Sequence, residues 1–208
     1  MSDSSVDTVT AALNDFAVEL PSWGFSDTGT RFGRYLQESA AANIAERFAD
    51  AAQVHGSTGA CPTLALHVEW DIPRGTDLSS IHALSAQYGI RPGAINPNTF
   101  QDQRFKHGSL CNEQPEIRSK ASDDIAYSIR VAAELGNQDI SLWFADGSNY
   151  PGMANIRKRK TWLTEGLKHA HSQLTPLQKL LIEYKPFEPA FYHTDIADWG
   201  MAQHLARL

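Results

Sequence analysis

The sequence has few cysteines, no long apolar run and no secretory leader pattern, and each shortage excludes a class of protein. Its two cysteines, Cys61 and Cys111, are too far apart for a common structural metal motif. We expect both to be reduced thiols in a cytoplasmic protein. The N-terminus lacks a basic segment followed by an apolar core, and no stretch approaches the ~18 apolar residues of a membrane span. We therefore expect no membrane partner.

Concentrated positive charge is also scarce. The formal net charge is -6, and the one basic cluster is IRKRK at 156–160, which we expect on the solvent face of a helix. A nucleic-acid partner is therefore not expected. With 42% hydrophobic and 20% charged residues, the chain should instead fold around a core, as a single domain spanning 1–208 or as part of a larger one.

Short apolar runs that suit buried strands alternate with segments of helical periodicity. Because parallel strands joined by helices give this order, we expect parallel βαβ units with right-handed crossovers. Gly56 and Gly89 are expected to end the first two helices, and Asp195 to cap the last one. The expected strands are 16–23, 63–70, 90–100, 139–147 and 179–187, and the expected helices are 39–56, 77–89, 115–136, 155–174 and 195–208.

Two arrangements fit this alternation, an open doubly wound sheet and a (β/α)8 barrel. No G-x-G-x-x-G motif follows a strand, whereas polar residues gather at the carboxyl ends of several strands. We therefore predict an α/β fold of the (β/α)8 TIM-barrel type. About five βα units are present, and a complete barrel has eight in about 250 residues. We expect 1–208 to be an N-terminal portion truncated before the last three units, inactive and poorly folded alone.

The fifth strand ends in EYKPFEP, which places a carboxylate and an amine two positions apart. Side chains two apart share one face of a strand, so Glu183 and Lys185 point into the barrel mouth if Leu180 and Ile182 face the helices. They could form a structural ion pair. Alternatively, the carboxylate could bind a divalent metal while the lysine polarises a substrate oxygen.

Aromatic and imidazole side chains follow two other strands. His67 and Trp70 lie at the end of the second strand and Trp143 at the end of the fourth. All three could be ordinary core residues. Near strand ends they could also wall a sugar site, because the C–H face of a sugar packs on aromatic rings.

Five blocks of the sequence resemble one enzyme family. EYKPFEP resembles the E-x-K-P-x-E-P signature of xylose-isomerase-like sugar isomerases. Over nearly all of residues 16–208, the chain resembles the Pseudomonas-type L-rhamnose isomerases. The resemblance implies a metal-dependent barrel enzyme that interconverts L-rhamnose, L-rhamnulose and related aldoses and ketoses. The five blocks are FAVELPSWGFSDTGTRFGRY, CPTLALHVEWDIP, GAINPNTFQD, SLWFADGSNYPG and EYKPFEPAFYHTDIADWG.

The resemblance also implies residue roles. Glu183 matches the first ligand of the structural metal, and Lys185 matches a lysine that contacts the substrate near its C1 and C2 oxygens. His67 matches the histidine near the ring-opening end of the sugar. Trp143 and Trp70 match the aromatic side of the pocket.

The same resemblance implies partners and cofactors. Phe32 matches a phenylalanine lent to a neighbouring subunit's site, which implies a homotetramer. Two divalent ions for each site are implied, with Mn²⁺ the first expectation and the remaining ligands beyond this chain. Hydrogen transfer between C1 and C2 could be a hydride shift or proceed through an enediol. Two alternatives stay open: a metal-dependent endonuclease of the same barrel type, which the net charge disfavours, and a non-catalytic, truncated sugar-binding or assembly piece.

Overall fold

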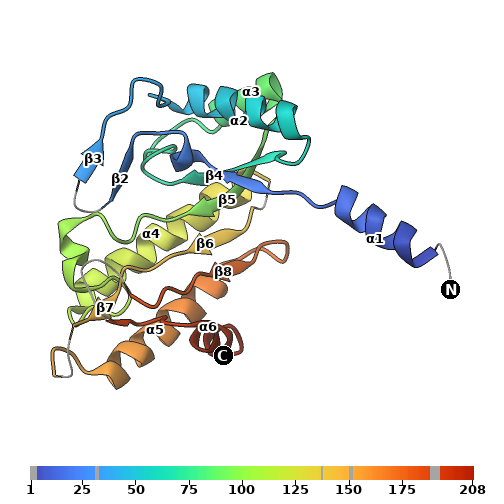
Figure 1. Ribbon diagram of the computed structural model, residues 1–208. Coiled ribbons are helices and arrows are strands. Elements are labelled where there is room, and N and C mark those ends of the chain that lie inside the picture. The colour runs from blue at the N-terminus through green and yellow to red at the C-terminus, as the bar shows by residue number, and fades with distance from the viewer. Residues whose placement is uncertain (1–3, 31–32, 137, 150–151, 188–192) are drawn as a thin grey trace.

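A five-stranded parallel sheet, flanked by helices, organises the chain in a computed structural model that describes residues 4–30, 33–136, 138–149, 152–187 and 193–208 (Figure 1). Its strand order is β1-β4-β5-β6-β8, so each strand pairs with the preceding one in the chain, as in a barrel. This confirms the predicted α/β fold. The strands are β1 (Glu19–Pro21), β4 (Thr63–His67), β5 (Arg91–Asn96), β6 (Ile140–Leu142) and β8 (Leu180–Ile182).

Each of the five strands is followed by one helix, directly after β4 and with short elements between strand and helix after the other four. The helices are α2 (Ile44–Thr58), α3 (Ser79–Tyr88), α4 (Pro115–Glu134), α5 (Ile156–His171) and α6 (Trp199–Ala206). Short 3-10 turns, η1 (Ser22–Gly24) and η2 (Gln103–His107), lie after β1 and β5.

Three features were not expected from the sequence. Helix α1 (Ser4–Asn14) extends away from the body of the molecule in Figure 1. Strands β2 (Thr28–Thr30) and β3 (Gly33–Tyr35) form an antiparallel hairpin. Strands β7 (Gly147–Ser148) and β9 (His193–Thr194) form a second antiparallel pair, which joins the loops after β6 and β8.

Helix ends differ from the expectations in two places. Helix α2 runs through Gly56 and ends at Gly59, whose φ of 69° is the left-handed conformation that glycine adopts without strain. Helix α6 is capped by Asp198, which accepts a hydrogen bond from the backbone N–H of Met201 at 2.7 Å. The prediction that Asp195 caps this helix is therefore wrong. Gly89 ends α3 as predicted.

Alternation along the strands separates a core face from an inner face. Leu64, Leu66, Ile95, Ile140 and Leu142 are buried in one apolar cluster with residues of the surrounding helices. The outward residues of β8, Leu180 and Ile182, pack against the same cluster. Because alternate residues of a strand point to opposite faces, Glu183, directly after β8, continues the inner face, whereas Lys185 lies beyond the strand and its placement on that face stays a prediction.

An irregularity in β5 is accommodated by the first strand. The register shifts between the pairs Leu64–Pro92 and Leu66–Ile95, which inserts one extra residue in β5. The N–H of Ala94 is satisfied there by the Glu19 carboxylate at 3.1 Å. That carboxylate occupies the space above Gly93, where a Cβ would lie 1.8 Å from Glu19 Oε2.

No helix among the described residues has the length and apolar character needed to cross a bilayer.

Candidate active site

His67, the last residue of β4, is enclosed by aromatic rings. Its ring stacks on Trp70 with a centroid distance of 3.7 Å and an interplanar angle of 17°. Trp23 and Phe100 meet it edge-on, at 6.0 and 5.7 Å. His67 is only 4% exposed, whereas Trp70 is 37% exposed. The neighbouring rings thus cover His67, and the Trp70 ring lies between His67 and solvent.

The row of rings continues across the sheet to the strand that carries the lysine. Phe100 lies edge-on to Trp143, with centroids 4.7 Å apart. Lys185 Nζ lies 5.0 Å from the Trp143 ring centroid, within cation–π distance. Four of the residues singled out in the sequence, His67, Trp70, Trp143 and Lys185, therefore line one continuous row. Phe100 links its two halves, and its position after β5 is the only sequence signal that could have indicated it.

Glu183 and Lys185 engage different neighbours. Ser141 Oγ, on the inner face of the adjacent strand β6, donates a hydrogen bond to Glu183 Oε1 at 2.6 Å. The Glu183 side chain is exposed and Lys185 is half-buried against Trp143. Phe32 lies outside the described residues.

The protonation state of His67 follows from burial and one hydrogen bond. Its Nδ1 lies 2.7 Å from the carbonyl oxygen of Val68. Because a carbonyl oxygen only accepts, we assign the proton to Nδ1, which leaves a lone pair on Nε2. Burial lowers the pKa of His67 to about 4, against the opposing effect of the Val68 carbonyl. At neutral pH the ring is therefore a neutral hydrogen-bond acceptor.

A buried carboxylate fixes the backbone of His67. Asp71 accepts a hydrogen bond from the His67 N–H at 2.7 Å and another from Ser22 Oγ. Its second oxygen pairs with Arg47 of α2. The Asp71 side chain is fully buried, and its bonds join the end of β4 to Arg47 of helix α2.

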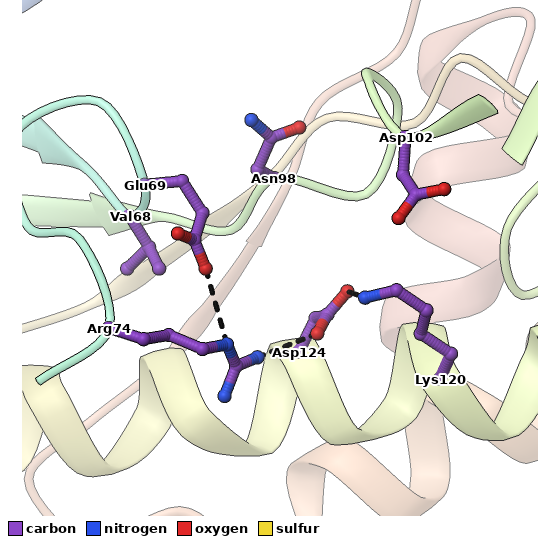
Figure 2. Close-up of a pocket in the computed structure, with 7 residues that line it drawn as sticks. All are labelled: Val68, Glu69, Arg74, Asn98, Asp102, Lys120 and Asp124. Atoms are coloured by element: carbon purple, nitrogen blue, oxygen red, sulfur yellow. Dashed lines mark hydrogen bonds and ion pairs between the residues drawn. The ribbon is translucent and has the colours of Figure 1, made fainter. Parts of the chain in front are cut away.

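A residue in the left-handed backbone conformation explains how Trp70 folds back onto His67. Glu69 has a φ of 75° and is the one described non-glycine residue with positive φ. Its N–H donates to Ile72 O at 3.0 Å, which closes a tight turn. The Glu69 carboxylate pairs with Arg74 at 3.2 Å beside a cavity of about 150 Å³ (Figure 2). Nothing in HVEWD predicts this conformation.

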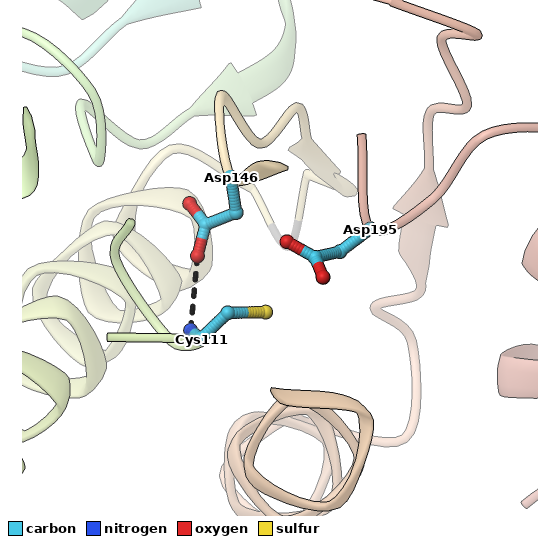
Figure 3. A group of neighbouring side chains, drawn as sticks. All are labelled: Cys111, Asp146 and Asp195. Atoms are coloured by element: carbon cyan, nitrogen blue, oxygen red, sulfur yellow. Dashed lines mark hydrogen bonds between the residues drawn. The ribbon is translucent and has the colours of Figure 1, made fainter. Parts of the chain in front are cut away.

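Cys111, Asp146 and Asp195 lie near enough to suggest a metal site, with one ligand atom from each within 4.8 Å of the others (Figure 3). The two carboxylates already have partners. Asp146 accepts hydrogen bonds from the Ser109 N–H and Oγ and from the Cys111 N–H, at 2.7 to 2.9 Å. Asp195 is paired with Arg159. Burial, followed by the Asp146 charge, raises the pKa of the Cys111 thiol. This cluster is a buried polar network.

No other set of three potential ligands occurs among the described residues. Glu183 brings a single carboxylate, and a divalent ion needs several ligands. The described residues therefore do not form a complete metal site by themselves.

Comparison of sequences relates the chain to two curated proteins. It is 32% identical to a probable sugar isomerase of Mesorhizobium japonicum over 98% of this chain and 48% of that protein. It is also 32% identical to a probable sugar isomerase of Rhizobium meliloti, over 94% of this chain and 46% of that protein. The chain spans about half the length of these relatives. No family model matches it.

Comparison of structures shows the fold. A D-allulose 3-epimerase from Methylomonas sp. has a TM-score of 0.62 at 14% identity, over 92% of this chain and 58% of that one. An L-ribulose 3-epimerase has a TM-score of 0.59 at 12% identity, over 92% and 56%. A family 2 AP endonuclease from Brucella melitensis has a TM-score of 0.54 at 14% identity, over 77% and 58%. The chain is thus similar in sequence to probable sugar isomerases along nearly its whole length, and it shares its fold with sugar epimerases.

Proposed function

We propose that this chain carries part of the active site of a metal-dependent aldose–ketose isomerase, acting on L-rhamnose, L-rhamnulose and related sugars. The observation that carries the proposal is the row of His67, Trp70, Trp143 and Lys185 at the carboxyl ends of the strands. The sequence similarity to probable sugar isomerases supports the reaction class. The choice of L-rhamnose rests on the sequence resemblance alone.

In this proposal the rings bind the sugar and two polar groups act on its oxygens. Trp70 and Trp143 pack against the C–H face of the sugar. His67 Nε2 accepts a hydrogen bond from the hydroxyl at the ring-opening end, which its neutral state at pH 7 allows. The Lys185 ammonium donates to the oxygens at C1 and C2, where negative charge develops during the hydrogen transfer.

Metal binding, assembly and location are further parts of the proposal. Glu183 would contribute one oxygen to a divalent-metal site, with Mn²⁺ the first ion to test and the remaining ligands outside this chain. The proposal also includes a cytoplasmic homotetramer in which Phe32 reaches a neighbouring site.

The test measures ketose formation from L-rhamnose with Mn²⁺ present, for the 208-residue chain and for any longer product of the same reading frame. In the active form, Lys185→Ala should lower turnover about 100-fold or more while the circular dichroism spectrum stays unchanged. Lys179→Ala, at the exposed start of the same strand, is the matched control and should keep full turnover. Equal turnover in the two variants would reject the role of Lys185.

Binding is measured separately from turnover. Quenching of tryptophan fluorescence by L-rhamnose without ketose formation would favour the non-catalytic sugar-binding alternative. Cleavage of abasic-site DNA with no response to sugars would favour the endonuclease alternative. The observation in favour of that alternative is the similarity of the fold to an AP endonuclease. In an active preparation, deuterium uptake from solvent at C1 or C2 of the product separates the enediol route from a hydride shift.

A further inference from the structure

The backbone of Lys185 is held at both of its polar groups by one returning segment. Its N–H donates to the carbonyl oxygen of Ile196 at 2.9 Å. Its carbonyl oxygen accepts a hydrogen bond from Thr194 Oγ1. Thr194 and Ile196 are buried and lie on either side of Asp195. The backbone of Lys185 is therefore tied to the segment that contains Asp195.

Asp195 is fixed by a buried arginine. Arg159 Nη2 and Nε reach the Asp195 carboxylate at 2.7 and 3.1 Å, a two-pronged pair that constrains both partners. Arg159 is 3% exposed, and its Nη1 also donates to His107 O at 3.3 Å. The Asp195 N–H donates to Asp146 O at 3.0 Å, so the segment is held by backbone and side chain together.

This arrangement overturns one expectation from the sequence. The cluster IRKRK was expected on the solvent face of its helix, and Arg157 and Lys158 are exposed there. Arg159 is instead turned inward to the Asp146–Asp195 network. A buried ion pair of this kind is seldom a net source of stability, so we consider instead that it positions neighbouring residues.

We propose that Arg159 and Asp195 are positioning residues that act through Thr194 and Ile196 to hold the Lys185 side chain against Trp143. The consequence for turnover rests on the function proposed above, whereas the positioning itself does not. The effect passes through the backbone of the returning segment, which bonds both polar groups of the Lys185 main chain. Removing the pair should therefore move the lysine while leaving Trp143 and the sheet in place.

The experiment observes Lys185 directly by NMR. Reductive methylation with ¹³C-formaldehyde labels each lysine as a dimethylamine that keeps its charge, and Lys185→Arg assigns the Lys185 signal. The ring current of Trp143 should displace this signal from those of exposed lysines. In Arg159→Lys, which keeps one positive charge but loses the two-pronged geometry, the signal should move toward the position of exposed lysines. Arg157→Lys, the same change on the exposed face of the same helix, should leave it unchanged.

A second variant covers the case in which Arg159→Lys fails to fold. Thr194→Val removes the hydroxyl that reaches the Lys185 carbonyl and leaves every charge paired. It should shift the Lys185 signal in the same direction by a smaller amount. An unchanged Lys185 signal in a folded Arg159→Lys protein overturns the proposal, and an unchanged signal in Thr194→Val does so if the arginine variant is unfolded.

Kinetics then separate this proposal from the proposed function. In an active form, Arg159→Lys should lower kcat about 100-fold with little change in KM, since a displacement of about 1 Å at a reacting group has this cost. Lys185→Met should lower kcat at least as much, and the double variant should lose nothing further. If Lys185→Met keeps full turnover, the proposed function fails, and the NMR result still decides the positioning of Lys185.

Discussion

Lowering the pH should destabilise the fold through His67. The folded chain binds a proton at His67 with a pKa of about 4, below the ordinary value of 6.5, because burial disfavours the imidazolium. The unfolded chain therefore binds more protons between these values, and stability falls as pH drops from about 6.5 toward 4. At about 1.4 kcal/mol for each tenfold change, the full loss is about 3 kcal/mol. That is a large part of a typical stability of about 5–15 kcal/mol.

The assay compares urea unfolding of the wild type with that of His67→Asn at pH 7.5 and 4.5. An asparagine amide can still donate to Val68 O, yet it does not titrate. Over this interval the wild type should lose about 2.5 kcal/mol more than the variant. The comparison is needed because burial raises the pKa of Glu19 and of Asp146, and stability from those groups is lost as pH rises. His82→Asn, at an exposed position of α3, should behave as the wild type does.

An NMR titration of His67 measures its protonation directly, so the test does not depend on a sharp unfolding transition. The Hε1 proton signal of His67 should keep its neutral position down to about pH 5. Equal pH dependence in wild type and His67→Asn, or a midpoint near 6.5 for this signal, would refute the assignment of His67 as a neutral, desolvated base.

Three further substitutions test the packing around the site. Gly93→Ala should displace the Glu19 carboxylate and cost about 2 kcal/mol in urea unfolding; a cost that stays equally large in a Glu19→Ala background would contradict this. Asp71→Asn should lower stability by about 3 kcal/mol because Arg47 loses its buried counter-charge, and an unchanged melting temperature would exclude that role. Glu69→Gly should change stability by less than about 1 kcal/mol, whereas Glu69→Val should cost about 2 kcal/mol; equal costs would argue against a strained turn.

Much of the sheet and part of the site follow from local patterns. Apolar runs bounded by polar residues located the five strands, because a parallel strand is buried on both sides. The two-residue period then predicted that Glu183 and Lys185 share the inner face, once Leu180 and Ile182 were assigned to the core. Helix ends were less predictable, because either Gly56 or Gly59 could end α2 and only the φ of Gly59 decides.

What the sequence did not predict depends on partners far along the chain or on an uncommon backbone conformation. Arg159 lies among four basic or apolar neighbours that face water, and its burial depends on Asp195, 36 positions later. The stacking of Trp70 on His67 requires a left-handed glutamate, a conformation that no local pattern announces. Asp198, not Asp195, is the helix cap because α6 begins at Trp199.

Two buried carboxylate–guanidinium pairs have the same relation to the two polar residues of the proposed mechanism. Asp71, paired with Arg47, accepts the backbone N–H of His67. Asp195, paired with Arg159, lies between the two residues that bond the backbone of Lys185. Each pair fixes a main chain and leaves His67 Nε2 and the Lys185 ammonium outside its own hydrogen bonds. A site that binds reacting oxygens needs its polar groups held in fixed positions, and the two pairs fix the backbones that carry these groups.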